Sequence, residues 1–273
     1  MGLDPVWLTF PLLGLLAGVL AGLLGIGGGI VLVAALVLLL PHFGVPAEAV
    51  MHVALGTSLA SIVLTAAAST RAHWRRGSVL WPSVAWLAPG LVLGGLAGSR
   101  VAVGLAGDTL ALFVGVFCFG MAARMAWPQR AGERSQEPLA APRGPLLIAA
   151  GAGIGAVSAL VGIGGGSLTV PLLAARGVAV VRAVGTSSAC GIVIALSSAA
   201  GYALGAPPGD ALASTLPWGC VGYVHVPAAL GIGAGALVAA PWGVALAHRL
   251  SGAALSRVFA LALAVVGVAL LWP

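Results

Sequence analysis

Long hydrophobic stretches alternate with short polar segments along the whole chain of 273 residues. A transmembrane helix needs roughly 20 consecutive apolar residues, and each of the hydrophobic stretches reaches about that length. They cover residues 6–41, 48–70, 79–103, 108–127, 145–175, 183–205, 216–247 and 253–272. The pattern therefore predicts an all-α polytopic membrane protein that is embedded in a lipid bilayer.

Composition supports the membrane class and argues against a soluble domain, a nucleic-acid-binding protein and a disulfide-rich or metal-binding protein. Hydrophobic residues make up 60% of the chain, charged residues only 7%, and the mean hydropathy is +1.14, whereas soluble domains carry about 25% charged residues. All twelve basic residues are arginines, and they lie near span ends and in loops, as membrane topology requires. The net charge of +6 therefore does not indicate nucleic-acid binding. The three cysteines have no paired spacing, so neither a disulfide framework nor a metal site is expected.

One polar segment, residues 128–144, separates two hydrophobic parts, 1–127 and 145–273. The two parts share motifs in the same order, namely Gly-Ile-Gly-Gly-Gly at 25–29 and 162–166, and Gly-Thr-Ser at 56–58 and 185–187. This order predicts a tandem duplication. We expect two homologous repeats joined by a polar linker, each with a glycine-broken first segment and three further transmembrane helices.

Arginine placement predicts the orientation of these repeats, because basic residues collect in cytoplasmic loops. A cytoplasmic linker places the loop near His42 outside and the following arginines inside: Arg71, Arg75, Arg76, Arg176, Arg182 and Arg249. Arg176, Arg182 and Arg249 can all lie on the cytoplasmic side only if residues 145–175 enter and leave the membrane on the same face. Residues 162–166 would then form the tip of a hairpin. This scheme makes the repeats inverted and leaves Arg100 near the outer face. A continuous first helix in each half would instead give parallel repeats.

The glycine motifs lie in the middle of long hydrophobic stretches. Backbone groups in a bilayer must be paired internally, so a helix is interrupted only where protein or a polar cavity receives the freed groups. Helix packing through small residues explains two glycines per copy but not three in a row, which favour a break. Paired breaks mark transporter binding sites. We therefore expect a substrate site at Gly25, Gly27, Gly28, Gly29, Gly162, Gly164, Gly165 and Gly166.

Further motifs surround the breaks. The second copy continues as Ser167-Leu168-Thr169-Val170-Pro171, Gly-Thr-Ser follows one helix later, and the first half has the loop Arg75-Arg76-Gly77. With these motifs the chain resembles the sulfite exporter TauE/SafE (TSUP) family of membrane permeases over essentially its whole length. The resemblance implies a multi-pass carrier of the bacterial inner membrane for sulfite, sulfonates or other sulfur-containing anions. The first half departs from the pattern with Ala34 in place of Pro171, which predicts a straighter helix there.

The chemistry of the motifs agrees with an anionic substrate. Backbone N–H groups at a helix N-terminus attract anions, and glycine allows close approach of an oxygen. Hydroxyl groups from both halves can complete the donor shell, and these are Thr57, Ser58, Ser61, Thr186, Ser187 and Ser188. Any single hydroxyl can also bond a carbonyl of its own helix. Because the Gly-Thr-Ser element is duplicated, we favour the ligand role and expect these hydroxyls to govern affinity more than folding.

Acidic residues are absent from the middle of the predicted spans. They lie at span ends or in loops: Asp4, Glu48, Asp108, Glu133, Glu137 and Asp210. A cation carrier typically places a carboxylate within the membrane, so cation transport is disfavoured. His52, one turn after Glu48, is a candidate for proton coupling, although a structural role is more common for a lone histidine near a span end.

The sequence thus predicts a secondary transporter for small anions, with sulfite or organosulfonates as substrates and export as the direction. Uptake of another small organic anion, a non-transport membrane subunit and an intramembrane enzyme are the alternatives. An enzyme needs a nucleophile with a partner, a metal set or a carboxylate pair, and none is evident, so no enzyme and no cofactor are predicted. Nothing in the sequence indicates an oligomeric state.

Overall fold

The computed structural model describes residues 8–24, 28–126, 141–205, 215–247 and 252–271, and most of them are helical. The first half contains α1 (Thr9–Leu24), α2 (Gly29–Leu39), the 3-10 helix η2 (Leu40–Phe43), α3 (Ala47–Trp74), α4 (Trp81–Val103) and α5 (Gly107–Ala126). The second half contains α6 (Pro145–Val161), α7 (Gly166–Ala174), α8 (Val180–Gly205), β1 (Cys220–Val221), β2 (Val224–His225), α10 (Val226–Ala247) and α11 (Gly252–Leu271).

The helices confirm an all-α membrane class. Among the described residues, α3, α4, α5, α8 and α10 each provide a segment long and apolar enough to cross a membrane. The predicted interruptions are also present, because residues 6–41 form α1 and α2 and residues 145–175 form α6 and α7. Each of the two hydrophobic stretches that contain a glycine motif is therefore two helices.

The prediction of a span over residues 216–247 was wrong in its first part. The hairpin of β1 and β2 precedes α10. Gly219 and Gly222 have φ values of 90° and 52°, which only glycine adopts readily, so a helix cannot pass through them. The apolar residues around these glycines resemble a span in composition, and this hid the turn.

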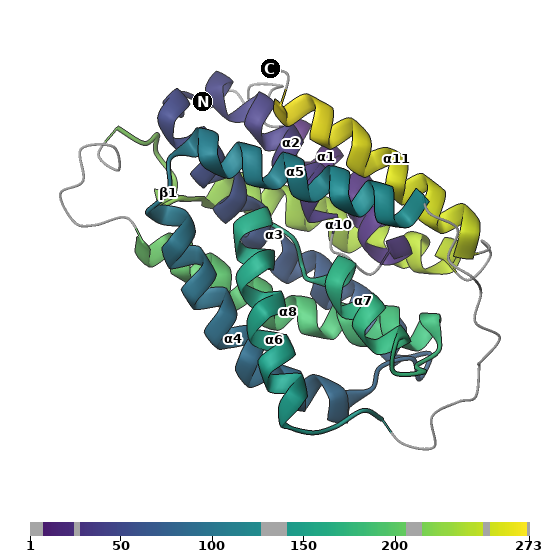
Figure 1. Cartoon of the computed structure of the whole chain (residues 1–273). Coiled ribbons are helices and arrows are strands. Elements are labelled where there is room, and N and C mark those ends of the chain that lie inside the picture. The colour runs from purple at the N-terminus through teal and green to yellow at the C-terminus, as the bar shows by residue number, and fades with distance from the viewer. Residues whose placement is uncertain (1–7, 25–27, 127–140, 206–214, 248–251, 272–273) are drawn as a thin grey trace.

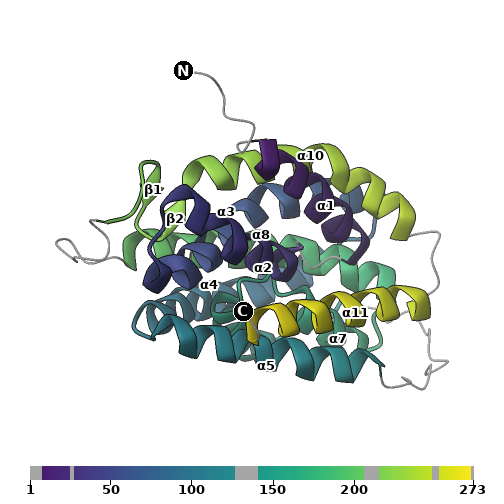
Figure 2. The same ribbon diagram turned by 90° about the horizontal axis from the view of Figure 1, so that it is seen from above.

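Helices α3 and α8 form an antiparallel pair at the centre of the molecule. The hydroxyl oxygens of Ser69 and Ser188 are 3.1 Å apart, whereas Gly56, near the start of α3, faces Tyr202, near the end of α8. In Figure 2, α5 and α11 lie along one side of the molecule and α1 and α10 along the other, with α2, α3 and α8 between them. The core therefore forms around one long helix from each half.

The first helix of each half packs against a helix of the other half. Helix α1 runs parallel to α10, since Gly14 contacts Ile232 and Gly18 contacts Ala236. Helix α6 runs parallel to α4, since Gly90 contacts Ile148 and Gly94 contacts Ala152, and the two helices lie side by side in Figure 1. In both pairs a Cβ atom on the glycines would collide with backbone of the partner helix, so small residues permit this close packing.

The segments with glycine motifs double back on themselves. The rings of Phe10, in α1, and Phe43, after α2, have centroids 4.8 Å apart, so this segment begins and ends at the same end of the molecule. In the second half, Ala141, just before α6, and Val170, in α7, pack against one cluster of buried residues. Helices α2 and α7 therefore return the chain towards the end from which α1 and α6 start.

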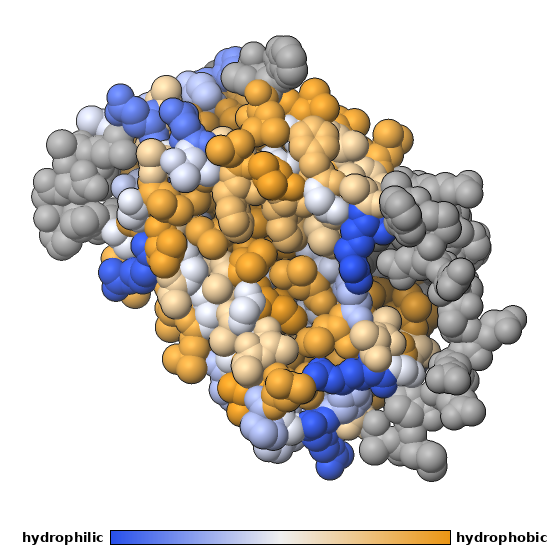
Figure 3. Space-filling model, in the orientation of Figure 1, coloured by the Kyte–Doolittle hydropathy of each residue, from blue (hydrophilic) through white to orange (hydrophobic). Residues whose placement is uncertain are grey.

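Arginines gather at one end of the bundle. Helices α4, α6 and α8 start there, as shown by hydrogen bonds from Ser83 to Pro142 and from Leu80 to Thr186, and α3 and α5 end there. At this end lie Arg71, Arg75, Arg76, Arg124, Arg143, Arg176 and Arg182. At the opposite end lie Glu48, Arg100 and Asp108. Figure 3 shows hydrophobic residues over the middle of one face and hydrophilic residues towards its margins.

Candidate functional site

Glycine backbone conformations set the start of α2 and α7. Gly28 precedes α2 with φ 65°, and Gly165 precedes α7 with φ 72°. Residues other than glycine rarely adopt this left-handed backbone conformation, which explains why the helices restart directly after these two glycines. The described motif glycines, from Gly28 to Gly29 and from Gly162 to Gly166, are all buried. Gly25 and Gly27 lie outside the described residues.

The two breaks meet inside the protein. The hydroxyl oxygen of Ser58, in α3, lies 3.1 Å from the carbonyl oxygens of both Gly29 and Gly162, and it donates to them. A Cβ atom on Gly29 would collide with the carbonyl oxygen of Gly162. Residues from two halves of the sequence thus form one central junction, with the Ser58 hydroxyl between the two motifs.

The Gly-Thr-Ser elements are not brought together. Since α3 and α8 are antiparallel, Thr57 lies beside the hairpin, where its oxygen accepts a hydrogen bond from the His225 amide at 2.9 Å. Thr186 lies at the arginine-rich end, where its oxygen accepts from the Leu80 amide at 3.0 Å and donates to the Arg182 carbonyl at 2.7 Å. At a rise of 1.5 Å per residue, the two elements are about 20 Å apart.

The remaining predicted hydroxyls are also buried, and most of them bond to the protein itself. Ser61 donates to the Ser58 carbonyl at 2.7 Å. Ser188 donates to the Val184 carbonyl at 3.1 Å and lies beside Ser69. Ser187 has no exposed surface. Hydrogen bonds of this kind hold helices in place, so direct contact between these hydroxyls and a substrate stays a prediction.

Three other hydroxyls, which the sequence reasoning did not select, lie around the second break. Ser158, Ser167 and Thr169 are nearly or fully buried, and their hydroxyl oxygens have no hydrogen-bond partner within the described part of the chain. Buried polar groups are almost always hydrogen-bonded, so these three hydroxyls are available to a ligand or to water. Ser167 and Thr169 directly follow the second glycine motif, which was the available signal in the sequence.

His52 joins α3 to the loop after α4. Its Nε2 donates to the Leu105 carbonyl at 2.9 Å, and its ring centroid is 5.2 Å from that of Tyr223. The Nδ1 atom has no partner among the described residues. Nearby, burial lowers the pKa of His225, in β2 outside the spans, so this ring is neutral at pH 7. These contacts suit the structural role that is more common for such a histidine, and the alternative of proton coupling by His52 is untested.

Within the part of the chain that the structure describes, carboxylates and metal ligands do not gather near the breaks. The acidic residues with described side chains are Glu48 and Asp108, both in the first turn of a helix. Among the residues that the structure describes, no group of three His, Cys, Asp or Glu side chains could hold a metal ion. The described part of the junction therefore offers hydroxyls and backbone amides rather than charged groups.

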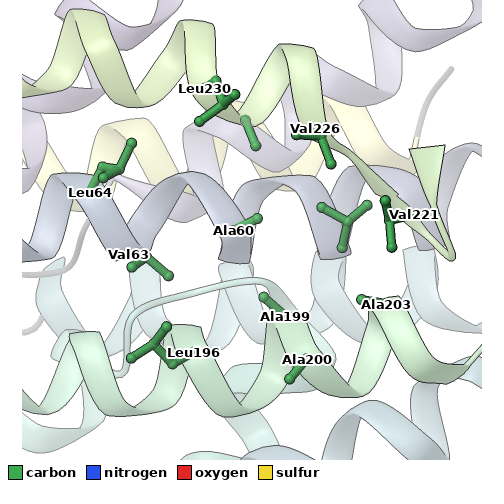
Figure 4. A pocket seen from close by; sticks show the side chains of 12 residues that line it. Ala60, Val63, Leu64, Leu196, Ala199, Ala200, Ala203, Val221, Val226 and Leu230 are labelled. Atoms are coloured by element: carbon green, nitrogen blue, oxygen red, sulfur yellow. The ribbon is translucent and has the colours of Figure 1, made fainter. Parts of the chain in front are cut away.

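A separate groove with a volume of about 480 Å³ lies between α3, α8, α10 and the hairpin (Figure 4). Its walls are aliphatic: Ala60, Val63, Leu64, Leu196, Ala199, Ala200, Ala203, Val221, Val224, Val226, Ala229 and Leu230. An anion would lose its hydration there without gaining hydrogen bonds. This groove is consequently not the anion site.

Known proteins resemble the chain over most of its length. A family model described as sulfite exporter TauE/SafE matches residues 10–270. A probable membrane transporter protein of Haemophilus influenzae is 36% identical over 261 residues, which cover 94% of this chain and 95% of the relative. A probable membrane transporter protein of Xylella fastidiosa (strain Temecula1) is 29% identical, over 94% of this chain and 92% of the relative. No solved structure matches.

Proposed function

Because the chain belongs to the sulfite exporter TauE/SafE family, we propose that it exports small sulfur-containing anions, namely sulfite or organosulfonates, as a secondary transporter. The protein is a membrane transporter and not an enzyme, in keeping with its family and relatives. The substrate and the direction are our proposal.

The meeting of the two glycine breaks at the Ser58 hydroxyl carries the proposal. The first amides of a helix have no partner within that helix, and they bear part of its positive dipole. At the second break these amides belong to Gly166 and Ser167, at the start of α7. An oxyanion is the natural ligand for such amides, as in other transporters with broken helices.

The distribution of charge favours an anion over a cation. Glu48 and Asp108 start their helices at the end opposite most described arginines, so neither carboxylate lies near the junction. Carriers of cations or protons usually place a carboxylate at the substrate. The arginine-rich end would also attract anions to the mouth of a pathway, although membrane topology alone accounts for these arginines.

We also propose that residues 1–127 and 145–273 are inverted repeats. Equivalent helices related by a two-fold axis in the membrane plane must be antiparallel, whereas parallel repeats keep them parallel. The antiparallel packing of α3 with α8 supports the inverted arrangement. So do Gly115 and Gly267, which contact Leu271 and Phe119 across α5 and α11 in antiparallel order.

The arginine-rich end is the cytoplasmic end in this proposal, and the linker 128–144 lies on the same side. Basic residues favour the cytoplasmic face, and seven described arginines share that end. The relatives from Haemophilus influenzae and Xylella fastidiosa are bacterial proteins, which supports the inner membrane as the location.

Transport by purified protein tests the proposal. Liposomes that contain the protein and a high internal concentration of sulfite should accumulate sulfur-35 sulfite from outside by exchange, and external methanesulfonate should compete. Protein-free liposomes are the control. Exchange no faster than in protein-free liposomes, with both anions, would contradict the proposed substrate class. Preference for a carboxylate such as acetate would favour the alternative organic-anion carrier.

A further inference from the structure

The two glycine breaks have different side chains around them. At the constant offset that aligns the motifs, three hydroxyl residues of the second half, Ser158, Ser167 and Thr169, replace three apolar residues of the first half, Ala21, Ile30 and Leu32. All six side chains are buried. The two halves therefore share the backbone break, but only the second half has hydroxyl side chains at these three positions.

In the second half, the hydroxyls lie close to the start of α7. The Ser158 oxygen is 3.3 Å from the position that a Cβ atom on Gly165 would occupy, and Gly165 is the residue that precedes α7. Ser167 is the second residue of the helix, at its start, whereas Thr169 lies two residues further on and therefore on another face of the helix. None of the three oxygens has a hydrogen-bond partner in the described structure.

In the first half, the corresponding positions are filled by packing. Ile30 and Leu32 are 2% and 0% exposed and belong to the main hydrophobic core. Gly28 lies against the backbone of Ala17, where a Cβ atom would come within 2.6 Å of the carbonyl oxygen. The Ser58 hydroxyl binds carbonyl oxygens at the junction, so it is not free to donate to an anion.

We propose that the substrate anion binds at the second break alone, while the first break serves as its rigid packing partner. The amides at the start of α7 and the hydroxyls of Ser158 and Ser167 are the donors. Several donors of this kind suit a small oxyanion with three oxygens on one atom, as in sulfite or a sulfonate. This inference rests on the proposed function, and it assigns the site to one half.

Removal of single hydroxyls tests the assignment. Binding of sulfite, in oxygen-free buffer, and of methanesulfonate is measured by calorimetry on the purified full-length protein. Ser158→Ala and Ser167→Ala should each weaken binding about tenfold or more, because a donor to a charged ligand is lost. Ser197→Ala is the matched control, since this buried hydroxyl bonds the Val193 carbonyl of its own helix at 2.9 Å. Its affinity should stay within about twofold of the parent.

Conservative changes at the first break complete the test. Ile30→Val and Leu32→Ile should leave affinity within about twofold, because these side chains touch no ligand. Equal losses at the two breaks would overturn the asymmetry. Unchanged affinity in Ser158→Ala and Ser167→Ala would overturn it as well, since the hydroxyls would then hold only water.

Transport measured on the same preparations separates this inference from the proposed function. If the parent exchanges sulfite while Ser158→Ala and Ser167→Ala bind normally, the site assignment fails and the function stands. If the parent neither binds nor exchanges either anion, both fail. Thermal melting of each variant identifies a folding defect. Ser158 and Ser167 lie in different helices, so one variant remains informative if the other unfolds.

Discussion

Replacement of Ser58 by alanine should destabilise the protein by a predictable amount. The Ser58 side chain has no exposed surface, and its hydroxyl is 3.1 Å from the carbonyl oxygens of Gly29 and Gly162. The Gly29 carbonyl can still accept the amide of Val33 within α2. The Gly162 carbonyl accepts no other hydrogen bond in the described structure. A buried acceptor left unpaired costs about 1–3 kcal/mol of folding free energy.

Ser61→Ala provides the matched comparison. Ser61 is equally buried in the same helix, but its hydroxyl binds only the Ser58 carbonyl, three residues earlier, at 2.7 Å. That carbonyl keeps its partner within the helix, so the expected loss is about 1 kcal/mol or less. With about 2–4 °C per kcal/mol for a chain of this size, Ser58→Ala should melt roughly 2–12 °C below the parent. Ser61→Ala should melt within about 4 °C of it.

The assay is thermal unfolding in detergent, followed by tryptophan fluorescence, together with calorimetric sulfite binding at a temperature where both variants are folded. Equal melting temperatures for Ser58→Ala and the parent would refute the stabilising role of the Ser58 hydroxyl. A loss of sulfite affinity of tenfold or more, without a change in melting temperature, would show instead that the Ser58 hydroxyl is a ligand donor, as the sequence alone suggests.

Three further predictions follow from the glycine conformations, the charge distribution and the histidine. Gly165→Ala should abolish transport, because it combines left-handed strain of about 1–2 kcal/mol with a collision against Ile194. Gly177→Ala, at a residue with φ 81° and open space around it, should retain transport. Equal transport activities of the two variants would contradict this prediction. Cysteines at positions 135 and 47, in a variant without native cysteines, should label from opposite sides of the membrane; labelling from one side would contradict the inverted scheme. His52→Gln should leave the pH profile of transport unchanged; a flattened profile would establish coupling.

Much of the architecture was predictable because it depends on local properties. The length of each apolar stretch fixes whether it can cross a bilayer, and adjacent glycines favour a break wherever they occur. The sequence therefore located the starts of α2 and α7, at Gly29 and Gly166, and the all-α membrane class. It missed the hairpin before α10, because the two turn glycines are separated by apolar residues with the composition of a span.

The candidate site depended on contacts between distant segments. Residues 29, 58 and 162 meet at one hydroxyl, and no local pattern records that meeting. The antiparallel packing of α3 with α8 separates the two Gly-Thr-Ser elements, although their duplication suggested one shared site. Packing of α6 and α7 in the bundle buries the hydroxyls of Ser158 and Ser167, which have no hydrogen-bond partner among the described residues. The sequence thus determined where the backbone breaks, since that follows from neighbouring residues. Tertiary packing alone decided which polar groups remain available to a ligand, because each hydrogen bond depends on what another helix places beside it.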